Sequence, residues 1–193
     1  DVLPARVPGY QPRLLDELGA LGEVAWVGRG SVGRDDGRVV LHRPGREALH
    51  PSGPLDGAAP PAGPRHEAIR TQLRRRGASF YRDLYTAAGG GSDREVLDAL
   101  WDLVWAGEVT NDTFAPLRAL RWKRPTRPTA RPRPGRLTAL GPPEAAGRWS
   151  LVEDAPAGGS PTERLHATAL ALLDRHGVLV REAVMAEGVE GGF

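Results

Sequence analysis

The sequence has no cysteine, which excludes disulfide bonds and thiol chemistry. It also has no apolar run near the length of about 18 residues that a transmembrane helix needs, so a membrane partner is not expected. The first residues, Asp1-Val2-Leu3-Pro4, lack a methionine and lack the character of a signal peptide. We therefore expect a cytoplasmic segment taken from within a longer protein.

Motifs for catalysis or nucleotide binding are lacking as well. No GxxxxGK[ST] loop occurs, and the glycine run 89–91 lies between two expected helices instead of between a strand and a helix. The five histidines, His42, His50, His66, His166 and His176, have no metal-ligand spacing. The sequence singles out no pair of carboxylates. We predict no catalytic residue, metal site or cofactor site within this segment.

Basic residues are unevenly distributed, although the formal net charge is only +2. No acidic residue lies between Asp112 and Glu144. That acid-free stretch contains Arg118, Arg121, Lys123, Arg124, Arg127, Arg131, Arg133 and Arg136. The chain also has 25 glycines and 18 prolines, which predict much loop and linker.

Two internal repeats organise the chain. The pattern LxxLxxxGEV of residues 15–24 recurs over 100–109, 85 positions later. A helical pattern that begins at His66 and stops at Gly77 recurs from His166 to Gly177, 100 positions later. Each helical stripe ends at a glycine, the usual stop signal because glycine accepts a positive φ at little cost.

Together the repeats give the element order of a winged helix-turn-helix. In the central copy we predict helices at 65–76, 80–87 and 93–105 and a strand at 109–111. The first copy supplies only a helix at 11–21 and strands at 24–28 and 38–42, and the last copy only two helices. The predicted fold class is α+β, mainly α: tandem winged helix-turn-helix units, one complete and two partial.

The corresponding domain boundaries follow from the connectors. We assign 1–48 to the C-terminal half of one winged helix and 49–122 to a complete unit. Residues 123–160 form an Arg/Pro-rich linker, in which 147–152 is expected to be a short strand returning to the second wing. Residues 161–193 form the N-terminal half of a further unit.

The third helix of the central unit has an unusual charge for a recognition helix. It carries Asp93, Glu95, Asp98 and Asp102 against the single cation Arg94. In a winged helix this element enters the major groove of DNA, where phosphates repel acidic side chains. We therefore favour packing of this helix against protein over contact with DNA.

Candidate nucleic-acid contacts lie outside that helix. They are Arg70, Arg74, Arg75, Arg76, Thr110, Asn111, Thr113, Arg121, Lys123 and Arg124. Each group has an alternative interpretation. The arginines that end the first helix also suit the helix dipole, the 109–113 stretch also suits a turn in which Asp112 or Thr113 caps a short helix, and the basic stretch also suits a solvated linker.

Three parts of the chain resemble the C-terminal region of Lhr, the large helicase-related superfamily 2 helicases. They are the string LWDLVWAGEVTNDT at 100–113 and the stretches 14–27 and 162–193. The resemblance implies a parent that is an ATP-dependent DNA helicase of DNA repair, with ATP and Mg²⁺ bound in upstream domains. Its partners would be single-stranded or duplex DNA, the helicase core of the same chain and, in an assembly, further copies of itself. It also implies similarity to winged-helix DNA glycosylases.

Three functions are consistent with the sequence. The first is a DNA-binding or assembly module of an Lhr-type helicase that is not catalytic by itself. The second is part of a uracil glycosylase domain, in which a carboxylate would stabilise an oxocarbenium-like transition state. The third is a winged-helix transcription regulator, against which the incomplete outer units argue.

Overall fold

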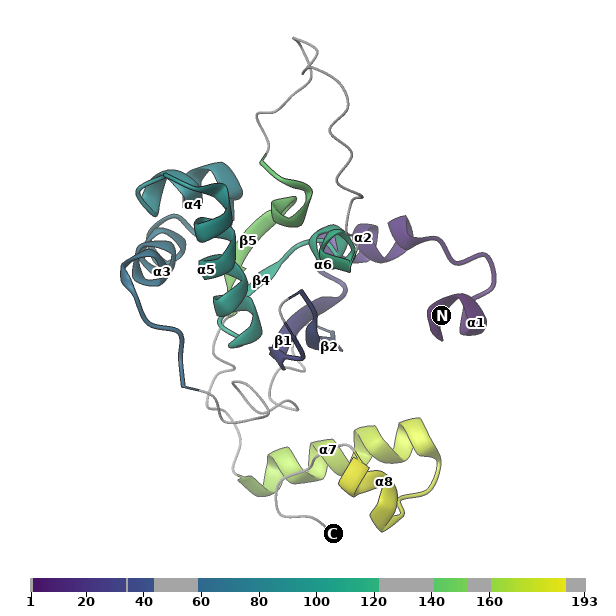
Figure 1. Ribbon diagram of the computed structural model, residues 1–193. Coiled ribbons are helices and arrows are strands. Elements are labelled where there is room, and N and C mark those ends of the chain that lie inside the picture. Colours follow the sequence, from purple (N-terminus) through teal and green to yellow (C-terminus); the bar gives the residue numbers. More distant parts are fainter. Residues whose placement is uncertain (1, 34, 44–58, 122–140, 153–160, 187–193) are drawn as a thin grey trace. The chain divides into compact units, whose positions relative to one another are not determined.

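The computed structural model describes residues 2–33, 35–43, 59–121, 141–152 and 161–186. They fall into two compact units, the first formed by 1–44 and 52–153 and the second by 45–51 and 154–193. The described residues are mainly helical, with one two-stranded and one three-stranded sheet (Figure 1). None of the described helices is long and apolar enough to span a membrane.

The central part of the first unit follows the winged-helix order. Its elements are α3 (Pro64–Arg76), β3 (Ser79–Phe80), α4 (Tyr81–Ala87), α5 (Asp93–Trp105), β4 (Val109–Asn111) and β5 (Arg148–Leu151). Strand β5 lies between β3 and β4 and pairs antiparallel with both. The strand expected at 147–152 therefore completes this sheet, and the basic stretch separates β4 from β5 along the chain.

Helix α5 forms the centre of the hydrophobic core. Its buried side chains are Val96, Ala99, Leu100, Trp101, Leu103, Val104 and Trp105. These positions occupy most of the helix circumference, because α3 and β4 contact α5 and so does β1 (Ala25–Ser31). A helix that is apolar on nearly every side is a core helix, and only the strip with its charged residues remains exposed.

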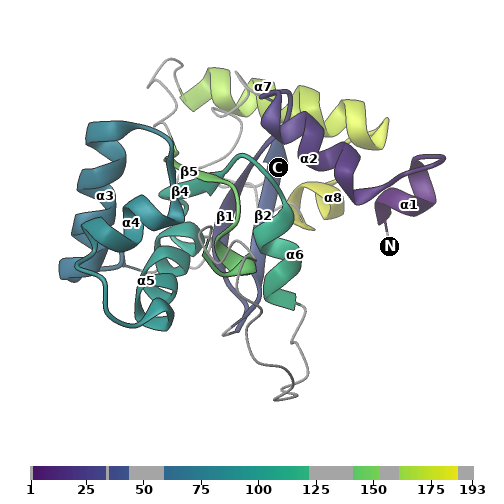
Figure 2. The ribbon, with the colours of Figure 1, turned by 90° about the horizontal axis from the view of Figure 1, so that it is seen from above.

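The N-terminal segment packs against this core. It contains α1 (Val2–Arg6), α2 (Pro12–Ala20) and the antiparallel pair β1 and β2 (Gly37–His42). Trp26 of β1 is fully buried, and its indole Nε1 donates a hydrogen bond to the carbonyl oxygen of Thr113 at 3.0 Å. Figures 1 and 2 both show β1 and β2 beside α5, on the side away from α3 and α4.

Three glycines permit this close approach. A Cβ added at Gly28 would lie 2.0 Å from the carbonyl oxygen of Val104. A Cβ at Gly37 would lie 2.5 Å from the ring of Trp105, and one at Gly19 would lie 2.6 Å from the carbonyl oxygen of Asp112. The absence of a side chain at these positions lets the backbone of the N-terminal segment reach the central unit.

Helix α6 (Ala115–Arg121) is held at its start by a residue far away in the sequence. The backbone N–H of Phe114 donates to Asp16 Oδ1 at 2.8 Å, and Arg118 pairs with the other oxygen of the same carboxylate. The first N–H groups of a helix lack intrahelical partners, and Asp16 of α2 satisfies one of them. Helix α6 also packs against the short 3-10 helix η3 (Pro143–Ala145).

The second unit contains α7 (Pro161–His176) and α8 (Arg181–Ala186). Between them Gly177 has a φ of 74° and donates its N–H to the carbonyl oxygen of Leu173 at 2.7 Å. This is the C-terminal stop that the second repeat predicted. Leu172 and Val184, one from each helix, are buried.

The helices predicted at 65–76, 80–87 and 93–105 are confirmed to within one residue at each end. Three further elements, α1, η3 and β3, were not predicted, because each is too short to show a hydrophobic period. The expected division into four domains stays a prediction.

We predict that Gly28→Ala destabilises the chain. The added methyl group cannot fit beside Val104 unless β1 moves away from α5, and overpacking of this kind costs about 2 kcal/mol of unfolding free energy. Urea unfolding followed by tryptophan fluorescence measures the loss. Ser31→Ala, at the exposed end of the same strand, is the control and leaves the unfolding midpoint unchanged. Equal midpoints for both variants would contradict the close packing of β1.

Candidate nucleic-acid interface

The acidic strip of α5 is engaged by other side chains of the protein. The contacts are Arg65 Nη2 to Glu95 Oε2 at 2.7 Å, His66 Nε2 to Asp102 Oδ2 at 3.1 Å, Arg94 Nε to Asp98 Oδ2 at 3.8 Å and Tyr81 Oη to Asp93 Oδ1 at 3.1 Å. Two of the partners come from α3, which packs beside α5. The prediction that this helix packs against protein is confirmed, and each of its four carboxylates has a side-chain partner within the unit.

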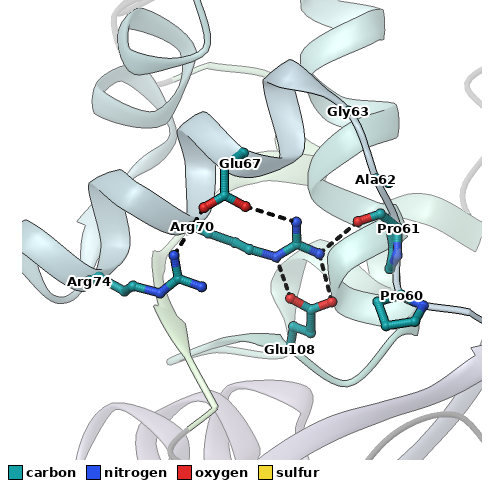
Figure 3. A pocket seen from close by; sticks show the side chains of 8 residues that line it. All are labelled: Pro60, Pro61, Ala62, Gly63, Glu67, Arg70, Arg74 and Glu108. Atoms are coloured by element: carbon teal, nitrogen blue, oxygen red, sulfur yellow. Dashed lines mark hydrogen bonds and ion pairs between the residues drawn. The ribbon is translucent and has the colours of Figure 1, made fainter.

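Arg70 is the most enclosed of the predicted contacts. Its side chain is 11% exposed and forms two parallel hydrogen bonds with Glu108, Nε to Oε2 at 2.6 Å and Nη2 to Oε1 at 2.8 Å (Figure 3). Nη2 also donates to the carbonyl oxygen of Pro61, and Nη1 lies 3.5 Å from Glu67. The hydrogen bonds with Glu108 raise the pKa of Arg70. Arg70 therefore holds α3 to the loop before β4 and has little capacity left for a phosphate.

The three arginines at the end of α3 are all exposed. Arg74 Nη1 donates to Glu67 Oε1 at 3.1 Å, in a pair in which both side chains are about 60% exposed. Arg75 and Arg76 have no ion-pair partner among the described residues. Their positive charges interact favourably with the negative, C-terminal end of the helix dipole. Because they are exposed, they are also accessible to an anionic partner.

The polar residues in and after β4 are bonded to other groups of the protein. Thr110 Oγ1 donates to the carbonyl oxygen of Trp26. Asn111 is 4% exposed, and its Oδ1 accepts hydrogen bonds from the backbone N–H and the hydroxyl of Thr113 at 2.9 and 3.0 Å. The predicted turn therefore exists, but Asp16 supplies the helix cap that was expected from Asp112 or Thr113.

The remaining predicted contacts lie at the basic stretch. Arg121 is the last residue of α6, and Lys123 and Arg124 fall outside the described residues. The described elements on either side of this stretch, α6 and η3, pack against each other.

Four residues with clear structural roles were missed by the sequence reasoning: Asp16, Trp26, Glu108 and Arg118. Each has its partner at least 38 positions away along the chain. No local pattern marks such pairs. Among the described residues, no group of three or more histidine and carboxylate side chains is placed to hold a metal ion.

Comparison with known proteins identifies related domains at both ends of the chain. Residues 1–44 match the third winged-helix domain of the large helicase-related protein family, and residues 158–193 match its fourth winged-helix domain. The match over 158–193 includes both helices of the second unit.

Two curated proteins align with the whole chain. A protein from Mycolicibacterium smegmatis named "Lhr helicase/ probable uracil glycosylase" is 42% identical over 210 residues, and one from Escherichia coli K12 named "Lhr helicase/uracil glycosylase" is 38% identical over 211 residues. The alignments cover 100% of this chain but only 13% and 14% of those proteins. The resemblance to Lhr helicases is confirmed, and this chain corresponds to a small part of them.

We predict that Glu108→Gln destabilises the first unit by about 2 kcal/mol, because it leaves the mostly buried charge of Arg70 without its carboxylate partner. Glu67→Gln is the matched control: Glu67 also lies beside Arg70, but it is 60% exposed and its loss costs about 0.5 kcal/mol or less. Urea denaturation of both variants measures the difference. Similar losses in the two variants would refute a special role for Glu108.

Proposed function

We propose that this chain is a DNA-binding module of an Lhr-type ATP-dependent DNA helicase of DNA repair and is not catalytic by itself. The whole-length alignment with two Lhr helicases supports this assignment. ATP and Mg²⁺ would act in the helicase core of the longer parent, to which the module would be attached. Assembly with further copies of the parent is part of the same proposal.

Within the module we propose a tandem of winged-helix units, one complete and two partial. The element order and sheet pairing of 64–151 support the complete unit. The matches at 1–44 and 158–193 support the two partial ones. The burial of α5 between α3 and β1 is the observation that supports the proposed way of binding DNA, in which this helix makes no contact with DNA. In this module the third helix, α5, joins the partial N-terminal winged helix to the complete central one, and DNA is bound elsewhere.

The exposed end of α3 is the phosphate-binding surface that the described residues support best. Arg75 and Arg76 are exposed and unpaired within the described part of the chain. Arg70, by contrast, is enclosed by its ion pair with Glu108. The other candidates in and after β4 form hydrogen bonds within the protein: Thr110, Asn111 and Thr113. Contacts between arginine side chains and phosphates contribute to DNA affinity but carry no sequence preference. Arg121, Lys123 and Arg124 of the basic stretch are proposed as additional phosphate contacts.

A second candidate function is supported by the names of both relatives, which join helicase with uracil glycosylase. Under this alternative the chain would contribute to a glycosylase domain of the parent. Uracil excision by the 193-residue chain alone would establish the alternative and overturn the non-catalytic assignment.

We predict that the double variant Arg75→Gln, Arg76→Gln weakens DNA binding and lowers its salt dependence. The slope of log K against log salt falls by roughly 0.7 to 0.9 for each arginine–phosphate pair that the variant removes. Fluorescence anisotropy with a labelled oligonucleotide at several salt concentrations measures the slope. Arg94→Gln, an exposed arginine on α5, is the control and keeps the original slope. An unchanged slope in the double variant would remove the end of α3 from the proposed interface.

A further inference from the structure

The edge of the three-stranded sheet places an exposed aromatic ring directly opposite an exposed arginine. Phe80 of edge strand β3 pairs with Arg148 of β5, and Ser79 pairs with Trp149. Ser79 and Trp149 are buried, so Phe80 and Arg148 share the outer face of the sheet. Directly opposed residues in an antiparallel pair have Cβ atoms about 5 Å apart. The two side chains therefore start from neighbouring positions on one surface, and that of Arg148 reaches Asp112, which follows β4 on the other side of β5.

Exposure of one aromatic ring is common and by itself indicates nothing. Here, however, Phe80 is 52% exposed while the residues on either side of it are buried: Ser79 is 5% exposed and Tyr81 is 2% exposed. The Tyr81 hydroxyl donates to the carbonyl oxygen and to Oδ1 of Asp93, both at 3.1 Å. Burial raises the pKa of Tyr81, so the phenol stays protonated and keeps these bonds. Phe80 is thus an apolar ring fixed on a rigid support.

Arg148 is held in place in a way that leaves part of its guanidinium available. Asp112 Oδ2 accepts from Arg148 Nε at 2.8 Å, and Asp112 Oδ1 accepts from its backbone N–H, also at 2.8 Å. The side chain is 51% exposed, and its two terminal nitrogens make no hydrogen bond within the described part of the chain. The pair with Asp112 orients the guanidinium and leaves these donors for an acceptor outside the protein.

The charge close to this pair favours an anionic partner. Arg76, four residues before Phe80, and Arg82, two residues after it, are exposed and unpaired among the described residues. One acid, Asp83, is exposed in the same stretch. An aromatic ring flanked by arginines is the combination with which proteins bind single-stranded nucleic acid, because every base offers a π face and every linkage a phosphate.

We propose that Phe80 and Arg148 form a stacking platform for an unpaired base of single-stranded DNA. The base would stack on the Phe80 ring, and the neighbouring phosphate would accept hydrogen bonds from the free guanidinium nitrogens of Arg148. The inference deepens the proposed function and rests on it, because it requires that the chain binds DNA. A duplex offers no unstacked base to the platform and binds only through phosphate contacts.

The decisive variant is Phe80→Leu, which keeps an apolar side chain on β3 but removes the aromatic face. Binding of a labelled oligothymidylate by the 193-residue chain, measured by anisotropy, weakens roughly fivefold or more, since base–aromatic stacking contributes about 1–3 kcal/mol. Phe80→Trp binds as well as the original chain or more tightly. Leu41→Ala, at a 45% exposed apolar residue of β2, is the control and leaves binding unchanged.

Two further measurements separate stacking from charge. The Phe80→Leu variant keeps the salt slope of the original chain, whereas Arg148→Gln lowers it by roughly 0.7. An oligonucleotide without bases binds the original chain and Phe80→Leu equally. Equal affinity of Phe80→Leu and the original chain for oligothymidylate, or an equal loss for single strand and duplex, overturns the platform while the DNA-binding function stands. Absence of any DNA binding by the original chain overturns both proposals.

Discussion

The described part of the first unit depends on the burial of α5 from two sides. Helix α3 covers one side, and strand β1 covers another with the fully buried Trp26. Gly28 permits β1 to approach, since any side chain there would overlap the carbonyl oxygen of Val104. A winged helix normally keeps its third helix free for the major groove. Once that helix is a core element, the N-terminal segment is fixed to the central part of the first unit, and any contact with DNA has to come from other surfaces.

The sequence was sufficient for the longer helices but not for the partners of individual side chains. The repeats at 85 and 100 positions, each ending in glycine, predicted the main helices because period and stop signal are local properties. Acidity of α5 correctly indicated packing against protein. The roles of Arg70 and Asn111 were not predictable, because Glu108 and Ala146, which bind them, lie 38 and 35 positions away. A polar side chain gives no local sign of whether a distant acceptor will enclose it.

The packing of the first unit encloses some of its arginines in ion pairs and leaves others exposed on the surface. Arg70 and Arg118 carry their positive charge into ion pairs that connect distant segments. Such pairs specify which segments meet, and removing one partner leaves a poorly solvated charge. Arg75 and Arg76, by contrast, sit at the end of α3, where the helix dipole already favours them without an acidic partner. The cations available to a phosphate are therefore those that the fold does not need.

This division has a consequence for the kind of DNA binding that the proposed function implies. Reading base sequence requires side chains at base edges in a groove, and the helix that would provide them is covered. Phosphate contacts and stacking on Phe80 respond to charge and to strand separation, whatever the sequence. A helicase acts on many sequences in turn, so an accessory module that ignores sequence imposes no pause at particular sites. Burial of α5 is therefore compatible with the proposed role beside a helicase core.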